Sequence, residues 1–177
     1  MAKPAVITLV LIWLVPPLVF GQSGLSSYSL GSGDRIYVQV YGESELSLEV
    51  LLNDAGSFSY PFLGELNAKG LTVTQLEEVI IDGLKGPYLV DPKVSVTILQ
   101  YRRFYVRGEV KKPGGFPYEP GMTLQKAVSL AQGFTDRASR TKFYIVSDND
   151  ELAKPTPATL NTVIKPGDIV MIEDSFF

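Results

Sequence analysis

The chain contains neither cysteine nor histidine in its 177 residues. Without cysteine there is no disulfide, no thiol nucleophile, no thiolate metal ligand and no lipid-modified cysteine at a mature N-terminus. Without histidine, the common nucleophile and base pairs and histidine-based metal sites cannot be assembled. No Gly-x-Ser-x-Gly or phosphate-loop pattern is present, and no carboxylate pair suits glycoside hydrolysis. We therefore expect a protein that is not an enzyme and has no catalytic residue, cofactor or metal.

Charged residues are scarce at the N-terminus, where Lys3 is the only one before Asp34. A short apolar stretch between a basic residue and small residues is typical of a secretory signal peptide. We expect residues 1–21 to be the signal, cleaved between Gly21 and Gln22, with an uncleaved anchor as the alternative. The apolar stretch is shorter than the ~20 residues of a membrane span and contains a proline pair.

Basic residues do not dominate the predicted mature chain, residues 22–177. Loss of the signal would leave 15 basic and 19 acidic residues, a formal charge of −4. This balance excludes the broad basic surface that nucleic acids need, so we expect no nucleic-acid partner. The remaining length suits one ordinary domain or two small ones.

The first half of the mature chain begins with strand patterns. Residues 36–40 alternate apolar and polar side chains, which predicts a strand with one buried face. Residues 49–52 and 57–60 flank Asn53-Asp54-Ala55-Gly56, and this turn-forming sequence predicts a hairpin between them. The hairpin leads into the segment 61–64, where Pro61 marks the end or the edge of the ladder.

Each half contains one helix pattern. Thr72 and Gln75 have the spacing of a capping box, and apolar residues at helical spacing predict a helix of about three turns that ends near Gly83 to Pro87. A strand follows at 94–99. In the second half, Thr123 precedes a short apolar helical face that ends before Gly133. The remaining strands are predicted at 104–106, 116–118, 143–146 and 169–172, and Asp148 is assigned to a plain hairpin loop.

A glycine-aspartate turn occurs twice, each time before a strand. Gly31-Ser32-Gly33-Asp34 precedes the first predicted strand, and Pro166-Gly167-Asp168 precedes the last. Glycine adopts positive φ without strain, and aspartate accepts hydrogen bonds from nearby backbone N–H groups. We expect two self-capping turns, although either aspartate can also be read as a contact for a ligand or a neighbouring subunit.

These phrases, in their order, resemble a known family. The segments 28–34, 45–47, 54–64, 70–72 and 91–96 resemble the polysaccharide export domain of the outer-membrane polysaccharide export family. The segments 106–114, 124–135 and 165–168 resemble the soluble-ligand-binding β-grasp (SLBB) domain that follows it. The turn residues that carry the match are Gly31, Gly33, Asp34, Gly56, Pro61, Gly64, Gly108, Pro113, Gly114, Gly167 and Asp168.

The resemblance implies an α+β fold of two small sheet-plus-helix modules, the second β-grasp-like. Their boundaries would be 22–102 for the export domain and 103–177 for the SLBB domain. It further implies a homo-oligomeric periplasmic protein that exports capsule or exopolysaccharide. Its subunits would form a ring-like conduit between an inner-membrane co-polymerase and an outer-membrane β-barrel channel.

The sequence departs from the longest family members in two respects. It contains no cysteine that could carry a lipid, and we expect it to be without the C-terminal pore helix of those members. We therefore expect a short periplasmic form, with peripheral contact to the outer membrane as a second option. The alternative function is a soluble periplasmic module that binds a glycan or small ligand and has no conduit role.

One basic cluster spans the boundary between the predicted modules. It can contact anionic polymer or an acidic face of the next subunit, or it can be a solvated strand edge protected by charge. Several tyrosines can likewise stack on sugar rings or simply pack on strand surfaces. The basic residues are Arg102, Arg103, Arg107, Lys111 and Lys112, and the tyrosines are Tyr28, Tyr37, Tyr41, Tyr101, Tyr105 and Tyr118.

Overall fold

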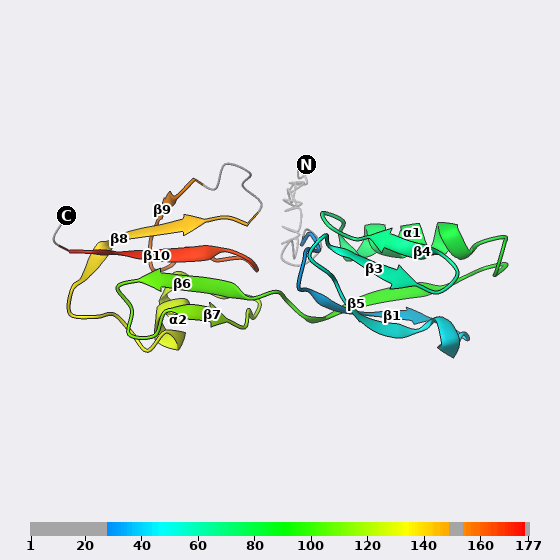
Figure 1. The fold of residues 1–177 in the computed structure, drawn as a ribbon, viewed down its shortest axis with the longest axis horizontal. Coiled ribbons are helices and arrows are strands. Elements are labelled where there is room, and N and C mark those ends of the chain that lie inside the picture. The colour runs from blue at the N-terminus through cyan, green and yellow to red at the C-terminus, as the bar shows by residue number, and fades with distance from the viewer. Residues whose placement is uncertain (1–27, 149–153, 176–177) are drawn as a thin grey trace, which may run out of the picture.

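The computed structural model describes residues 28–148 and 154–175, so the predicted signal sequence and its Gly21–Gln22 cleavage site lie outside the described residues. Figure 1 shows two sheet-containing modules side by side along the long axis, joined by the segment between β5 and β6. The predicted α+β class is confirmed. Within the described ranges, no helix has the length and apolar character needed to cross a membrane.

The first module is built around a three-stranded antiparallel sheet. The central strand β1 (Arg35–Val40) pairs with β2 (Leu48–Leu51) on one side and with β5 (Val94–Gln100) on the other. A short 3-10 helix η1 (Ser44–Leu46) connects β1 to β2. The predicted alternation is confirmed, because every second residue of β1 is buried. On this buried face, valine and isoleucine side chains lie opposite apolar partners from both neighbouring strands.

Helix α1 (Val73–Leu84) covers this apolar face. The predicted capping box is present, since the Thr72 side chain accepts from the Gln75 N–H and the Gln75 side chain accepts from the Thr72 N–H. Leu76 and Ile80 are fully buried in the core. Glu77 Oε1 also accepts a hydrogen bond from the Val96 N–H at 2.7 Å. The helix therefore satisfies one backbone donor on the free edge of β5.

The predicted hairpin between residues 49–52 and 57–60 is wrong. β2 pairs with β1, whereas β3 (Ser57–Tyr60) pairs with β4 (Gly64–Asn67), a strand that was not predicted. The turn itself exists, because Asn53 Oδ1 accepts from the N–H groups of Ala55 and Ser57. Turn chemistry fixes the local reversal, but it does not determine which strand completes the ladder.

The second module contains a mixed five-stranded sheet in the order β7-β6-β10-β8-β9. β10 (Ile169–Asp174) lies parallel to β6 (Phe104–Gly108) and antiparallel to β8 (Ala138–Val146). The hairpin of β6 with β7 (Gly114–Phe116) agrees with the prediction. β8 begins earlier than predicted, and the short edge strand β9 (Thr156–Ala158) was not predicted.

One helix, α2 (Leu124–Leu130), packs on the inner face of the second sheet. Its N-cap is Thr123, whose side chain accepts from the Lys126 N–H. Beyond the helix, Gln132 and Gly133 both have positive φ, and this left-handed conformation ends it. The residues buried between helix and sheet form a core separate from that of the first module; they include Phe104, Val106, Leu124, Ala127, Val128, Phe143, Ile145, Val170 and Ile172.

Candidate functional site: the cleft between the modules

The two glycine-aspartate phrases fold into the same turn. Asp34 Oδ2 accepts from the Gly31 N–H at 2.8 Å, and Asp168 Oδ2 accepts from the Lys165 N–H at 2.8 Å. Each aspartate N–H also donates to the carbonyl three residues earlier, at 3.2 Å in both cases. The preceding glycines have φ of 85° and 89°. Each turn places a carboxylate at the start of a strand, β1 or β10.

Both carboxylate oxygens of Asp34 accept hydrogen bonds from neighbouring groups. The Arg102 N–H donates to Oδ1 at 2.7 Å, while the Tyr28 hydroxyl donates to Oδ2 at 2.6 Å. The Arg102 guanidinium completes the set, with Nη1 3.2 Å from Oδ2. Burial, followed by the hydrogen bond to Asp34, raises the pKa of Tyr28 far above its usual value, so this hydroxyl remains a donor.

Asp168 has fewer partners although it is also buried. Its Oδ1 forms no hydrogen bond with any residue in the described part of the chain. Burial raises the pKa of Asp168, while the Lys165 N–H, the Asp148 backbone and the Ser147 side chain lower it. The net shift is upward, because the nearby donors do not fully replace the lost hydration.

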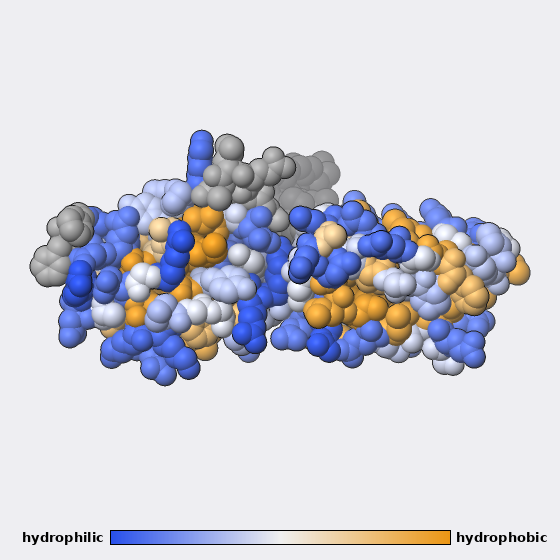
Figure 2. Space-filling view, viewed as in Figure 1, coloured by the Kyte–Doolittle hydropathy of each residue, from blue (hydrophilic) through white to orange (hydrophobic). Residues whose placement is uncertain are grey.

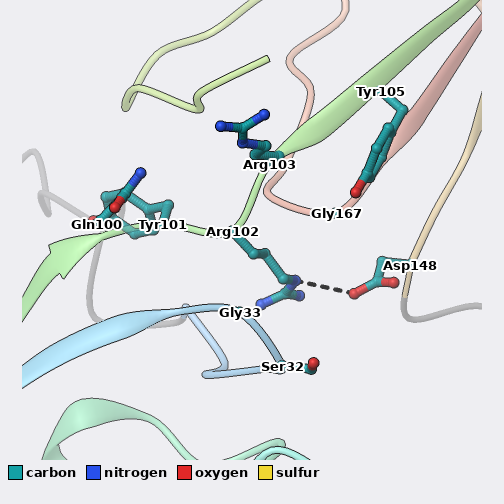
Figure 3. Close-up of a pocket in the computed structure, with 9 residues that line it drawn as sticks. All are labelled: Ser32, Gly33, Gln100, Tyr101, Arg102, Arg103, Tyr105, Asp148 and Gly167. Carbon is teal, nitrogen blue, oxygen red and sulfur yellow. Dashed lines mark hydrogen bonds and ion pairs between the residues drawn. The ribbon is translucent and has the colours of Figure 1, made fainter. Parts of the chain in front are cut away.

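Arg102 lies at the centre of the boundary and contacts both modules. Its side chain donates from Nε to Asp148 Oδ2 at 3.0 Å (Figure 3) and from Nη1 to the Tyr28 hydroxyl at 2.6 Å. Only 9% of the residue is exposed. The charge of the Arg102 guanidinium is therefore paired with the carboxylates of Asp34 and Asp148. The sequence placed it in a surface cluster and did not connect it with either carboxylate.

Three tyrosines extend the contact between the modules. Tyr28 and Tyr101 meet edge to face with ring centroids 5.1 Å apart, and Tyr101 meets Tyr118 in the same way at 5.4 Å. Tyr28 packs against the core of the first module and Tyr118 against that of the second. Edge-to-face aromatic pairs each contribute about 0.5–1.5 kcal/mol beyond burial of area. These rings and Arg102 together form contacts between the two modules.

A cleft of about 430 Å³ opens beside Arg102, and both glycine turns border it. Arg103 also lines it and is exposed, and its side chain forms no hydrogen bond or ion pair with another described residue. Figure 3 shows the side chains of Arg102 and Arg103 leaving the chain in different directions. The residues that line the cleft are Ser32, Gly33, Gln100, Tyr101, Arg102, Arg103, Tyr105, Asp148 and Gly167.

The other basic residues of the predicted cluster are not among those that line the cleft. Arg107 is exposed on β6, and its Nη2 lies 2.9 Å from Met171 Sδ. Lys111 and Lys112 are exposed between β6 and β7, where their backbone N–H groups donate to carbonyls beyond α2. The structure thus separates the cluster into one buried and one exposed arginine, both lining the cleft, and three basic residues on the surface of the second module.

The predicted turn residues also fall into separate places. Gly56 and Pro61 flank β3 and Gly64 begins β4, while Pro113 and Gly114 lie at the start of β7. Gly108 ends β6 with φ of 90°, where an added Cβ would lie 2.0 Å from the Ile172 carbonyl oxygen.

The polar groups that line the cleft are suited to binding a ligand through hydrogen bonds. They are hydroxyl, amide, carboxylate and guanidinium groups. In the described ranges, no three histidine, cysteine, aspartate or glutamate residues are grouped so that they can hold a metal ion.

Two family models match the chain in tandem. The model described as polysaccharide biosynthesis/export protein matches residues 23–99, and the SLBB domain model matches residues 103–154. The boundary between the two matches falls at the segment that contains Arg102.

Curated relatives match both regions. The chain is 38% identical over 120 residues to the exopolysaccharide production protein ExoF of Rhizobium meliloti, covering 60% of this chain and 28% of ExoF. It is 27% identical over 173 residues to the capsule polysaccharide export outer membrane protein CtrA of Neisseria meningitidis, covering 91% of this chain and 41% of CtrA. The chain thus spans less than half the length of these relatives. On these matches, it belongs to the polysaccharide biosynthesis/export family, with an SLBB domain after the export domain.

Proposed function

We propose that this protein is a component of a polysaccharide export assembly that handles capsule or exopolysaccharide. The observation that carries the proposal is the tandem match of the export and SLBB models, one on each module. The names of ExoF and CtrA agree with it, since both describe proteins of exopolysaccharide production or capsule export. The role is non-catalytic, and the protein acts in the periplasm, with peripheral contact to the outer membrane as the second option.

The proposed mechanism is geometric. Copies of the chain close into a ring by head-to-tail contacts between different faces of neighbouring subunits. The ring forms a conduit between an inner-membrane co-polymerase and an outer-membrane channel. A fixed orientation of the two modules supports this, because the angle within each subunit then sets the curvature of the ring.

Exposed apolar side chains offer surfaces for such contacts. Figure 2 shows hydrophobic areas on the viewed face of both modules. Large exposed apolar areas on a folded protein often mark interaction surfaces. The exposed large residues include Leu51, Phe62, Val90 and Leu99 in the first module and Tyr105, Leu130 and Val163 in the second.

Gene deletion followed by an assay of surface polysaccharide tests the export role. We expect loss of surface polymer, accumulation of polymer in the periplasm, and recovery with the wild-type gene. Unchanged surface polymer in the deletion strain would contradict the proposal. Light scattering of the mature protein with its co-polymerase tests the ring, and a strict monomer under all conditions would contradict that part alone.

A soluble receptor for a glycan or small ligand is the second candidate, and the polar cleft between the modules favours it. Calorimetry with oligosaccharides of the polymer repeat separates the two functions. A receptor binds them measurably and its deletion leaves export intact, whereas a conduit binds each repeat weakly and its deletion blocks export.

A further inference from the structure

The charges that line the cleft are unequally compensated. Arg102 is held by the carboxylates of Asp34 and Asp148, so this group carries a formal charge of −1. Arg103 has no such partner among the described residues. The formal charges of these four residues therefore sum to zero, and the uncompensated guanidinium of Arg103 remains a local attraction for an anion. A guanidinium binds carboxylate or phosphate oxygens in a bidentate geometry.

An aromatic ring and small polar groups accompany this arginine. Tyr105 is 50% exposed, and its ring covers Gly115 on the neighbouring strand, where an added Cβ would lie 2.9 Å from Cε1. A tyrosine ring presents an apolar face for the C–H groups of a sugar and keeps a hydroxyl for hydrogen bonds. Gln100, which is exposed, and Ser32, which is partly buried, line the same cleft, and they add amide and hydroxyl groups that both donate and accept.

The glycine turns keep the cleft open. Gly33 and Gly167 border it from the two modules, and both have positive φ that a side chain would strain. No side chain from these two positions fills the space. The volume of about 430 Å³ falls within the range of about 300–1,000 Å³ that is typical of small-molecule sites.

From these features we infer that the cleft binds one sugar unit that carries an anionic group, with Arg103 paired to the anion and Tyr105 stacked on the ring. The inference rests on the proposed function, because the exported polymer supplies the sugar. On this inference the substrate is an acidic glycan, and its anionic group is either a carboxylate or a phosphate.

Binding to the purified mature protein tests the site directly. The probes are a disaccharide that contains glucuronate, a sugar phosphate, and a neutral disaccharide of glucose, each titrated by NMR. We expect saturable binding of at least one anionic probe, with shifts at Ser32, Gln100 and Tyr105, and at least tenfold weaker binding of the neutral sugar. Arg103→Gln should weaken anionic binding at least tenfold, whereas Lys112→Gln removes an exposed charge outside the cleft and should leave it unchanged.

Several outcomes separate this inference from the proposed function. Equal binding of anionic and neutral probes, or wild-type binding by Arg103→Gln, overturns the site even if gene deletion abolishes export. Selective binding of one anionic probe supports the site and identifies the anion. If Arg103→Gln changes the oligomeric state and leaves sugar binding intact, Arg103 is a subunit contact and the inference fails. Unchanged export in the deletion strain refutes the proposed function independently of these titrations.

Discussion

Arg102 and Asp34 form a buried ion pair between residues 68 positions apart, with Nη1 3.2 Å from Oδ2. The backbone N–H of Arg102 adds a second bond, to Oδ1 at 2.7 Å. Asp34 is fully buried, so its charge depends on these donors and on Tyr28. The pair fixes the beginning of β1 against the segment that leads into the second module.

Replacing Arg102 should strongly destabilise the protein. Arg102→Met leaves the Asp34 carboxylate buried without its cation, and loss of one partner of a buried pair typically costs about 3–5 kcal/mol. Urea unfolding of the mature protein measures the change. Arg103→Met is the matched control, since this exposed neighbour should alter the free energy of unfolding by no more than about 0.5 kcal/mol. Equal midpoints for the two variants would show that Asp34 does not need the guanidinium.

Asp148 should affect the orientation of the modules more than their stability. Its side chain is 49% exposed, so its ion pair with Arg102 contributes about 0–1 kcal/mol. Asp148→Asn nevertheless weakens the side-chain link between Arg102 and the second module. We expect greater independent tumbling of the modules by NMR relaxation, with a nearly unchanged unfolding midpoint. Asp136→Asn, an exposed change in the same module, is the control, and identical tumbling of both variants would assign the orientation to the tyrosines alone.

Local chemistry made much of the fold predictable. The alternation in β1 and the capping box of Thr72 and Gln75 both act within a few residues, and both are present as expected. The partner of β2 was not predictable in this way. The turn-forming sequence at Asn53 correctly predicted a reversal of the chain. However, β2 pairs with β1, and β3 pairs with β4, which was not predicted.

The candidate site was harder to predict because it depends on distant contacts. Arg102 belongs to a run of basic residues that resembles a solvated surface, and nothing near it in sequence indicates burial. Its carboxylate partners lie 68 and 46 positions away. The glycine-aspartate phrases indicated turns, but only the folded chain brings both turns to one cleft.

Substitution of Gly33 should destabilise the protein through its backbone conformation alone. Its φ is 85°, while an added Cβ would meet only Arg102 Cβ, at an ordinary 3.5 Å. Gly33→Val should therefore lower the free energy of unfolding by more than about 1 kcal/mol through backbone strain. Thermal melting measures this loss. Gly33→Asn should melt closer to the wild type, since asparagine tolerates the left-handed region, and unchanged melting of Gly33→Val would refute the strain.

Gly108 should be far less tolerant than another glycine of similar conformation. Gly108 and Gly121 have φ of 90° and 78°, but an added Cβ at Gly108 lies 2.0 Å from the Ile172 carbonyl oxygen, whereas Gly121 has open space. Gly121→Ala should cost about 1–2 kcal/mol from the left-handed backbone. Gly108→Ala should cost at least about 1–3 kcal/mol more, because β6 and β10 must separate. Urea unfolding compares the two, and equal losses would show that the strands move apart freely.

Asp168 should make the second module less stable as the pH rises. Burial raises the pKa of this carboxyl in the folded state above the ordinary value of 3.8, so the folded protein holds its proton more tightly than the unfolded chain does. The resulting stability is fully present below pH 3.8 and is lost as the pH rises through the raised pKa.

Comparison with Asp168→Asn isolates this contribution, because asparagine keeps an acceptor for the Lys165 N–H but does not titrate. The difference in free energy of unfolding, wild type minus variant, should fall as the pH rises above 3.8 and level off beyond the folded pKa. The fall should persist in 1 M salt, since burial is screened much less than surface charge. A difference that stays constant or increases with pH would mean that neighbouring donors, such as the Ser147 hydroxyl, outweigh the burial of this carboxylate.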